Sequence, residues 1–326
     1  MGMGKRVIER ADIIDEEMTL DEAFKEYILE KQALNLSKKS IDNYEIDYFV
    51  FRRDMEITEY VYCNDIDNKV IQSWIVKLKR RVKIESINTY LTGIRAFLYW
   101  CMDEERKYIE KPFKIHKLKK QEEPPKHYTE EEIAVILEKP SKSAPYGEWR
   151  SWAIVNFILG TGARANTVCN IRLENIDFYN KEICYEKTKN NKSLVVPLSP
   201  TLETALKEYI RIWRKKAAPD ELLFPTISNT PFTSKELWYS TRRYFQKRGI
   251  EKTSVHGLRH TFAIGWVRNN GNVFKLQKIL GHQTLEMTKK YVKLYGEDLK
   301  EDFELYSPLD TAKRASSKKR EIHRNI

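Results

Sequence analysis

The feature that most limits how this chain can fold is a proline- and lysine-rich stretch at residues 111–126 of its 326 residues. Pro112, Pro124 and Pro125 disfavour a helix there, because proline lacks an amide hydrogen and clashes with the preceding turn. Apolar residues recur at helical spacing on both sides of the stretch. Since 326 residues exceed what one hydrophobic core normally serves, we expect two folded units joined by a basic linker, residues 111–127.

The first unit, residues 16–110, is predicted to be a bundle of four helices. Thr19 and Glu22 form a capping box, in which each side chain accepts the other residue's free backbone amide. The candidate caps of the next three helices are Ser37, Asn68 and Ser86. Apolar side chains follow each cap at spacings of three and four, so they lie on one face of each helix.

The second unit, residues 128–306, is predicted to be mostly helical with one β-hairpin. The whole chain is therefore expected to be mainly α with a small β-sheet (α+β). Two apolar runs, 183–185 and 194–198, flank a polar basic tip and indicate the hairpin strands. Helices are expected over 152–159, 202–213, 235–247, 258–267, 273–280 and 285–295. The basic tail, residues 307–326, is predicted to be disordered.

The net charge of +11 favours a polyanionic partner, and it is concentrated in two segments. Residues 111–126 carry six lysines against two glutamates, and residues 311–326 carry six basic residues against one glutamate. Basic segments of this kind suit a phosphate backbone, since each neutralised phosphate releases counterions. A linker and tail that merely keep the protein soluble would explain the same charge equally well.

The composition argues against several classes of protein. No apolar run approaches the roughly 20 residues that span a bilayer, and residues 1–15 lack an apolar signal core. The four cysteines lie far apart, without the paired spacing of a metal site, and are interpreted as reduced thiols. We therefore expect a cytoplasmic protein with no membrane partner and no bound metal or cofactor.

Polar residues near the C-terminus form a pattern that suits attack on a phosphodiester. Three of the six histidines fall within 256–282, in His-Gly-Leu-Arg-His at 256–260 and Leu-Gly-His at 280–282, and Tyr291 follows. A phosphate that gains negative charge needs fixed cationic donors, and the planar guanidinium of arginine binds two oxygens at once. Arg259 and the upstream Arg164 are the candidates for this role.

The spacing of these residues makes a structural prediction. The two histidines and the arginine of the first motif lie three and four residues apart, so they share one helical face. His282 and Tyr291 are nine residues apart, about half a turn out of phase on a continuous helix. They can face one site only if the helix breaks between them, and Gly281 and Thr284 are suited to end one helix and begin the next.

Each residue also has an ordinary structural interpretation. Tyr291 is one of 18 tyrosines and could simply pack, while His282 could cap a helix. Arg164 could pair with Asp177, and Lys189 could be a solvated turn residue. Taken together, however, the residues occur in the order that a single phosphoryl-transfer mechanism requires.

In this order the motifs resemble the catalytic unit of the tyrosine recombinases, also called the phage integrase family. That family shows a Thr-Gly-x-Arg turn, a hairpin lysine, His-x-Leu-Arg-His, Leu-Gly-His and a tyrosine nine residues further on. The matching segments here are 161–164, Lys189, 256–260, 280–282 and Tyr291. The resemblance covers about residues 130–305, and it extends to 16–110, which look like the family's SAM-like core-binding domain.

The resemblance implies a role for each of these residues. Arg164 and Arg259 would hold the scissile phosphate, with His256 assisting and His282 bonding a nonbridging oxygen. His260 would support the site. The family often has an acidic residue three positions after the first arginine, where this chain has Thr167, so the local bonding at that position is open.

The resemblance assigns the covalent step to Tyr291, which would form a 3′-phosphotyrosine link. Lys189 would protonate the leaving 5′ oxygen, with Lys187 and Lys192 as alternatives on the same hairpin. The implied function is site-specific recombination of double-stranded DNA by a homotetramer on paired sites. Accessory DNA-binding proteins are possible further partners. Further candidate DNA contacts are Lys77, Arg80, Arg81, Arg95, Lys117, Lys119, Lys120 and Lys192.

The biological role is open at this point. The segment at 164–167 favours a mobile-element integrase over a chromosome-dimer-resolving Xer-type recombinase. A type IB topoisomerase uses a similar set of residues, and a catalytically inactive DNA-binding relative would share the fold. The spacing from Leu-Gly-His to Tyr291 favours a recombinase over a topoisomerase, and the filled reacting positions disfavour an inactive relative.

Overall fold

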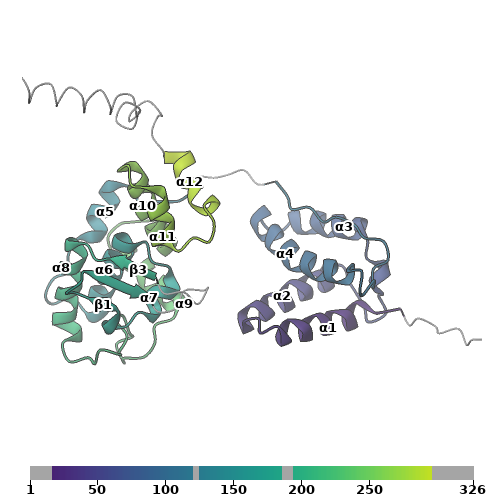
Figure 1. Ribbon diagram of the computed structural model, residues 1–326, viewed down its shortest axis with the longest axis horizontal. Helices are drawn as coiled ribbons and strands as arrows, with labels where there is room; N and C mark the ends of the chain where they lie inside the picture. The colour runs from purple at the N-terminus through teal and green to yellow at the C-terminus, as the bar shows by residue number, and fades with distance from the viewer. Residues whose placement is uncertain (1–16, 120–124, 186–193, 296–326) are drawn as a thin grey trace, which may run out of the picture. The chain divides into compact units, whose positions relative to one another are not determined.

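The computed structural model describes residues 17–119, 125–185 and 194–295 and divides the chain into two compact units (Figure 1). These units are Met1–Glu122 and Glu123–Ile326, and each contains its own hydrophobic core. The predicted fold class is confirmed, since both units are mainly helical and the second contains a small sheet. In the described part of the chain, no helix has the length and apolar content needed to cross a bilayer.

The first unit is a four-helix bundle. Its helices are α1 (Leu20–Ala33), α2 (Lys38–Asp54), α3 (Asn68–Lys79) and α4 (Ile84–Cys101), with a 3-10 turn η1 (Cys63–Asp65) between α2 and α3. The capping box at Thr19 and the cap at Ser37 are confirmed. The cap predicted at Asn68 is wrong, because Asp67 accepts the first free amides of α3. The cap predicted at Ser86 is also wrong, because α4 already begins at Ile84.

An aromatic cluster fills the core of this bundle. Phe24 stacks on Tyr48 with ring centroids 3.8 Å apart, and Phe97 meets both rings edge-on. At the α2–α4 contact a Cβ atom on Gly93 would overlap the carboxylate of Asp47. Asp47 is 8% exposed, and burial raises its pKa to about 7. The close helix approach therefore encloses an acidic side chain.

The chain that leaves α4 stays attached to the first unit. Ile109 and Ile115 are buried in its core. The hydroxyl of Tyr99 accepts the amide of Ile115, and the side-chain amide of Asn88 both donates to and accepts from the backbone of Leu118. The first part of the proline- and lysine-rich stretch therefore packs against the first unit up to Leu118.

The second unit is built around one central helix, α6 (Tyr146–Thr161), which contacts four other helices. The helices in contact with α6 are α5 (Glu130–Leu137), α8 (Pro200–Tyr209), α9 (Ser234–Gln246) and α10 (Val255–Arg268). The remaining elements are α7 (Ala165–Asn170), the 3-10 turn η2 (Leu173–Asn175), α11 (Val273–Leu280) and α12 (Glu286–Tyr295). The core therefore surrounds α6, whose C-terminal end leads directly into the predicted arginine turn.

The predicted hairpin is confirmed, and the sheet has one further strand. Strands β2 (Glu182–Tyr185) and β3 (Leu194–Pro197) pair antiparallel, with Ile183 opposite Val196. β1 (Ile176–Asp177) pairs antiparallel with β2 and completes a three-stranded sheet of order β1-β2-β3. Two residues are too few to produce an alternating pattern, which is why the sequence did not predict β1.

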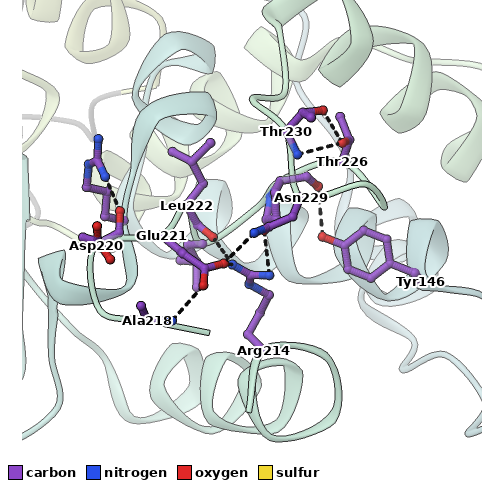
Figure 2. Close-up of polar contacts among 12 residues, drawn as sticks. Tyr146, Arg214, Ala218, Asp220, Glu221, Leu222, Thr226, Asn229 and Thr230 are labelled. Atoms are coloured by element: carbon purple, nitrogen blue, oxygen red, sulfur yellow. Dashed lines mark hydrogen bonds and ion pairs between the residues drawn. The ribbon is translucent and has the colours of Figure 1, made fainter. Parts of the chain in front are cut away.

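A polar network fixes the segment between α8 and α9 (Figure 2). α8 continues into η3, a π-helical turn (Ile210–Arg214). Arg214 donates to the Glu221 carboxylate at 2.7 Å, the Leu222 carbonyl at 3.1 Å and the Asn229 side-chain oxygen at 3.0 Å. Asn229 in turn donates to Glu221 at 2.7 Å. We call these residues (Arg214, Glu221, Leu222 and Asn229) the Arg214 network; it closes on itself and neutralises its own charge.

Candidate active site

Both candidate arginines are held by backbone carbonyls at the ends of helices. α6 and α11 each end in a left-handed glycine, Gly162 (φ 65°) and Gly281 (φ 58°). Arg259 on α10 donates to the carbonyls of Gly162 at 2.7 Å and Leu280 at 2.8 Å, and Arg164 donates to the carbonyl of Gly281 at 3.0 Å. Terminal carbonyls lack helical partners and carry partial negative charge, so they orient the guanidinium groups.

The positive charge of this pair is not neutralised locally. Arg259 is 4% exposed, and burial together with nearby Arg164 lowers its pKa to about 10. Burial also lowers the pKa of Arg164. Among the described residues, the hydrogen bonds of both guanidinium groups go to backbone carbonyls and neither group pairs with a carboxylate. An external anion is therefore the natural partner of the two arginines.

The left-handed turn at Gly162 accepts only glycine without rearrangement. A Cβ atom there would lie 2.6 Å from Cδ1 of Phe262 and 2.7 Å from Cδ2 of Leu280. The positive φ adds backbone strain for any other residue. The glycine of the Thr-Gly-x-Arg motif is thus required by the turn that presents Arg164 and supports Arg259.

Three histidines lie around the arginines. On α10 the rings of His256 and His260 are 4.4 Å apart between centroids. Burial and the neighbouring cations lower the pKa of all three, including that of His256. The pKa of His260 falls to about 3 and that of His282 to about 4. Their imidazoles are therefore mainly neutral at neutral pH, and each can both donate and accept a hydrogen bond.

Tyr291 lies on α12 and is 1% exposed. Its hydroxyl is 2.7 Å from Nδ1 of His260. Burial raises the pKa of Tyr291, and Arg259 partly opposes the rise. The predicted break between His282 and Tyr291 is confirmed, because α11 ends at Gly281 and α12 begins at Glu286.

The structure brings most of the candidates together, but not all of them. Arg164, Arg259, Tyr291 and the three histidines converge where α6, α10, α11 and α12 meet. Thr167 lies half-buried on α7, and no hydrogen bond among the described residues joins its side chain to this group. Lys187, Lys189 and Lys192 lie outside the described residues. Asp177 does not pair with Arg164; it caps its own turn by accepting from Tyr179 and Asn180.

Two residues of this site were not predicted. Thr288 is fully buried, and its hydroxyl lies 2.7 Å from Nδ1 of His282. The Lys290 ammonium lies 4.9 Å from the ring centroid of Tyr291, and burial followed by Arg259 lowers its pKa. The signal for Thr288 was available, since it precedes Tyr291 by three residues and therefore shares its helical face.

The candidate DNA contacts of the first unit have mixed surroundings. Lys77 donates to the carbonyl of Asp54 at 2.7 Å, and Arg81 pairs with the Asp54 carboxylate, so both also support the fold. Arg95 lies over the ring of Tyr99 at 5.8 Å from its centroid. The exposed members are Lys77, Arg80, Arg81, Lys117 and Lys119, and Lys120 lies outside the described residues.

No metal-binding cluster is found in the described ranges. Within residues 17–119, 125–185 and 194–295, no three His, Cys, Asp or Glu side chains gather in a way that could hold a metal ion. The polar groups that the structure brings together are cations, imidazoles and one phenol, which suit an anion rather than a cation.

The fold and the site together define a family. The model of the phage integrase family matches residues 126–297, and the model of the phage integrase N-terminal SAM-like domain matches residues 22–105. The chain belongs to the phage integrase family, as the sequence motifs predicted.

Individual relatives cover most of the chain. Tyrosine recombinase XerA of Pyrococcus furiosus is 29% identical over 236 residues, which are 71% of this chain and 78% of that protein. Tyrosine recombinase XerD of Staphylococcus haemolyticus is 24% identical over 299 residues, 90% of this chain and 99% of that protein. The Tn1549 transposon integrase, solved with a circular intermediate DNA, shares the fold at 19% identity and a TM-score of 0.70, over 87% of this chain and 97% of that one. The predicted class of enzyme, a tyrosine recombinase, is confirmed.

Proposed function

We propose that this protein is the site-specific recombinase of a mobile element, which cleaves and rejoins duplex DNA through a 3′-phosphotyrosine on Tyr291. The observation that carries the proposal is the arginine pair. Arg164 and Arg259 are fixed by helix-terminal carbonyls, pair with no carboxylate among the described residues and lie in one site with Tyr291.

The geometry supports in-line phosphoryl transfer. The two guanidinium groups bind the nonbridging oxygens and stabilise the charge that develops as Tyr291 attacks, with His256 and His282 adding hydrogen bonds. The Tyr291 oxygen forms a bond to phosphorus while the bond to the 5′ oxygen breaks. The proton for that oxygen comes from a hairpin lysine, for which Lys189 is our candidate. The 5′ hydroxyl of a partner strand then attacks phosphorus and releases the phenol.

We propose that the active assembly is a homotetramer on paired DNA sites, with the basic stretch after α4 crossing the DNA backbone. Support comes from structures of the same fold. A λ integrase tetramer was solved bound to a Holliday junction, at a TM-score of 0.68, and XerH was solved bound to its difH substrate, at a TM-score of 0.63. Because the substrate is DNA, the proposed place of action is the cytoplasm. Possible accessory DNA-binding proteins belong to the same proposal.

One observation favours a second candidate role, chromosome-dimer resolution. The XerD relative matches over nearly its whole length and 90% of this chain. Against it stand Thr167, where the family often has an acidic residue, and the fold match to a transposon integrase. Recombination assays on DNA that flanks the encoding element and on the host's dimer-resolution site separate the two roles.

The chemistry is tested with a nicked suicide DNA substrate that traps the covalent adduct. We expect wild-type protein to form an adduct that mass spectrometry maps to Tyr291, and Tyr291→Phe to form none. No wild-type adduct on any DNA from the encoding element, or an adduct that survives Tyr291→Phe, would contradict the mechanism. Supercoil relaxation without strand exchange between molecules would indicate a topoisomerase instead.

A further inference from the structure

The hydroxyl of Tyr291 is bonded to His260, a residue outside the set that holds the phosphate. The distance from the Tyr291 oxygen to Nδ1 of His260 is 2.7 Å, within the reach of a general base. A phenol attacks phosphorus far more readily when its proton is removed. The contact therefore raises the question of which group receives that proton.

The other groups around the phenol are poorly suited to accept it. His256 lies beside His260, with ring centroids 4.4 Å apart, but among the described residues the Tyr291 hydroxyl forms its hydrogen bond with His260 and not with His256. Arg164 and Arg259 stay protonated and only donate, and the Lys290 ammonium has no acceptor lone pair. His282 has its Nδ1 at 2.7 Å from the Thr288 hydroxyl, so that nitrogen is already engaged.

The position of His260 also favours this role. It follows Arg259 directly on α10, whereas Tyr291 lies on α12. One helix therefore carries both the phosphate-binding arginine and His260. The rings of His260 and Tyr291 already lie 5.7 Å apart between centroids.

Building on the proposed recombinase function, we propose that His260 accepts the proton of Tyr291 as its oxygen attacks phosphorus. The tyrosine O–H bond breaks as the Tyr291–phosphorus bond forms, and the proton moves to Nδ1, which gives an imidazolium. On rejoining, the proton returns to the phenol as it leaves phosphorus. Nδ1 can accept only in the tautomer whose proton is on Nε2.

The surrounding charges make this base dependent on substrate. His260 is neutral in the free protein, because burial and four neighbours lower its pKa to about 3. These neighbours are His256 and Arg259 on the same helix, Lys290 on α12 and His127 before α5. A bound phosphate diester offsets the cationic neighbours and raises the pKa of His260 from that value. Burial still opposes protonation, so proton transfer is coupled to phosphate binding.

The test compares His260→Ala and His260→Asn with wild-type protein in single-turnover cleavage from pH 6 to pH 10. We expect His260→Ala to cleave about 10²- to 10⁴-fold more slowly at pH 7 and to recover about tenfold per pH unit as the phenol ionises by itself. His260→Asn keeps a hydrogen-bonding side chain but cannot take the proton, so it stays slow. DNA affinity stays at the wild-type level in both variants.

A second substrate separates the two proton transfers. When sulfur replaces the leaving 5′ oxygen, the departing group needs no proton, so this DNA does not rescue either His260 variant. Tyr179→Phe removes the hydroxyl of a tyrosine that is 93% exposed and serves as a matched control with wild-type kinetics.

Several results would overturn the proposal. If His260→Asn cleaves at the wild-type rate, the contact between His260 and Tyr291 is only structural. If it cleaves faster than wild-type protein, the contact restrains Tyr291. If the sulfur substrate restores cleavage by a His260 variant, His260 acts on the leaving group instead. Nitrogen NMR of wild-type protein gives a test without mutation: Nδ1 of His260 must be unprotonated at pH 7. Failure of wild-type protein to form any adduct refutes the recombinase function itself. If wild-type protein forms the adduct and His260→Ala cleaves at the same rate, only the proposed role of His260 is refuted.

Discussion

Arg214 and the pair Arg164 and Arg259, all in the second unit, differ in the groups that accept their hydrogen bonds. Arg214 donates to a carboxylate, a carbonyl and an amide oxygen, so its charge is neutralised within the fold (Figure 2). Within the part of the chain that the structure describes, Arg259 and Arg164 donate only to backbone carbonyls. The Arg214 network stabilises a connection between helices, whereas the second pair keeps a net charge for an anion. The presence or absence of a carboxylate partner thus separates a structural arginine from a binding one.

Among the variants that test this comparison of arginines, the largest expected effect comes from Arg164→Lys. The single ammonium of lysine cannot bind two phosphate oxygens in the arginine geometry, so we expect cleavage to fall by about 10²- to 10³-fold. Arg164 is exposed, so the melting temperature should stay close to that of wild type. Single-turnover adduct formation and thermal unfolding measure the two quantities.

The matched control is Arg214→Lys. It loses the geometry that joins Glu221, Leu222 and Asn229, so the melting temperature should fall while cleavage per folded molecule stays unchanged. A folded Arg214→Lys protein that fails to cleave would break the distinction between the two arginine groups.

Gly162→Ala tests the support of Arg259. The added Cβ overlaps Phe262 and Leu280 at a positive φ, so we expect a loss of about 2–5 kcal/mol of stability and slower cleavage as the Gly162 carbonyl shifts from Arg259. Gly249→Ala is the matched variant, because Gly249 has φ +72° and no neighbour within 4 Å of the added atom. It should lose only about 1–2 kcal/mol of stability and keep full activity. If urea unfolding showed that Gly162→Ala and Gly249→Ala lose equal stability, the structure around Gly162 would have to relieve the overlap.

Acid should affect the active site before it affects the Arg214 network. The pKa of His282 is lowered to about 4 from 6.5 and that of Glu221 to about 2 from 4.5, the latter first by the Ala218 amide and then by Asn229 and Arg214. A lowered pKa gives stability that is present above the unfolded value and is lost as pH falls. We therefore expect the contribution of His282 to folding stability to be lost as the pH falls from 6.5 towards 4. The contribution of Glu221 should be lost as the pH falls from 4.5 towards 2.

Urea unfolding across this range measures both windows. His282→Asn should reduce the loss in the first window and Glu221→Gln the loss in the second. If Glu221→Gln changed the dependence of stability on pH only above pH 5, the assignment of the second window to Glu221 would be contradicted.

Asp47 in the first unit extends the comparison to a buried carboxyl group that has no hydrogen bond or ion pair with any described residue. Its pKa is raised by burial to about 7 from 3.8, so stability is greatest below pH 3.8 and is lost as pH rises through 7. Asp47→Asn should abolish this loss with little other effect. Hydrogen exchange of α2 and α4 in the full chain, measured by mass spectrometry at pH 5 and pH 8, checks it. Faster exchange of the variant at pH 8 would indicate that the ionised carboxylate is stabilised.

What the sequence could predict depends on the range of the interactions. The capping box at Thr19 and the helix break at Gly281 follow from neighbouring residues, and they appear as expected. The catalytic candidates could be named because each lies in a short motif. The cap at Asp67 depends on where a helix starts, which spacing leaves uncertain by a residue or two.

Long-range contacts lay beyond the sequence pattern. Nothing local indicates that Leu118 bonds to Asn88, 30 residues earlier, or that Arg214 reaches Asn229. The sequence pattern did not indicate that residues 111–118 pack against the first unit, because the one buried isoleucine there, Ile115, lies among lysines and next to no apolar periodicity.

The π-helical turn η3 has a consequence for how this chain tolerates insertions and deletions. A π turn contains one residue more than an α turn, so deleting one residue within 210–214 would convert it into a continuous α-helix. Each residue of an α-helix turns the chain by about 100°, so the side chain at the end of η3 would then point away from Glu221. The length of this turn therefore sets the direction of the side chain that follows it. Single-residue insertions or deletions in relatives should occur in the segment after residue 214 rather than within η3.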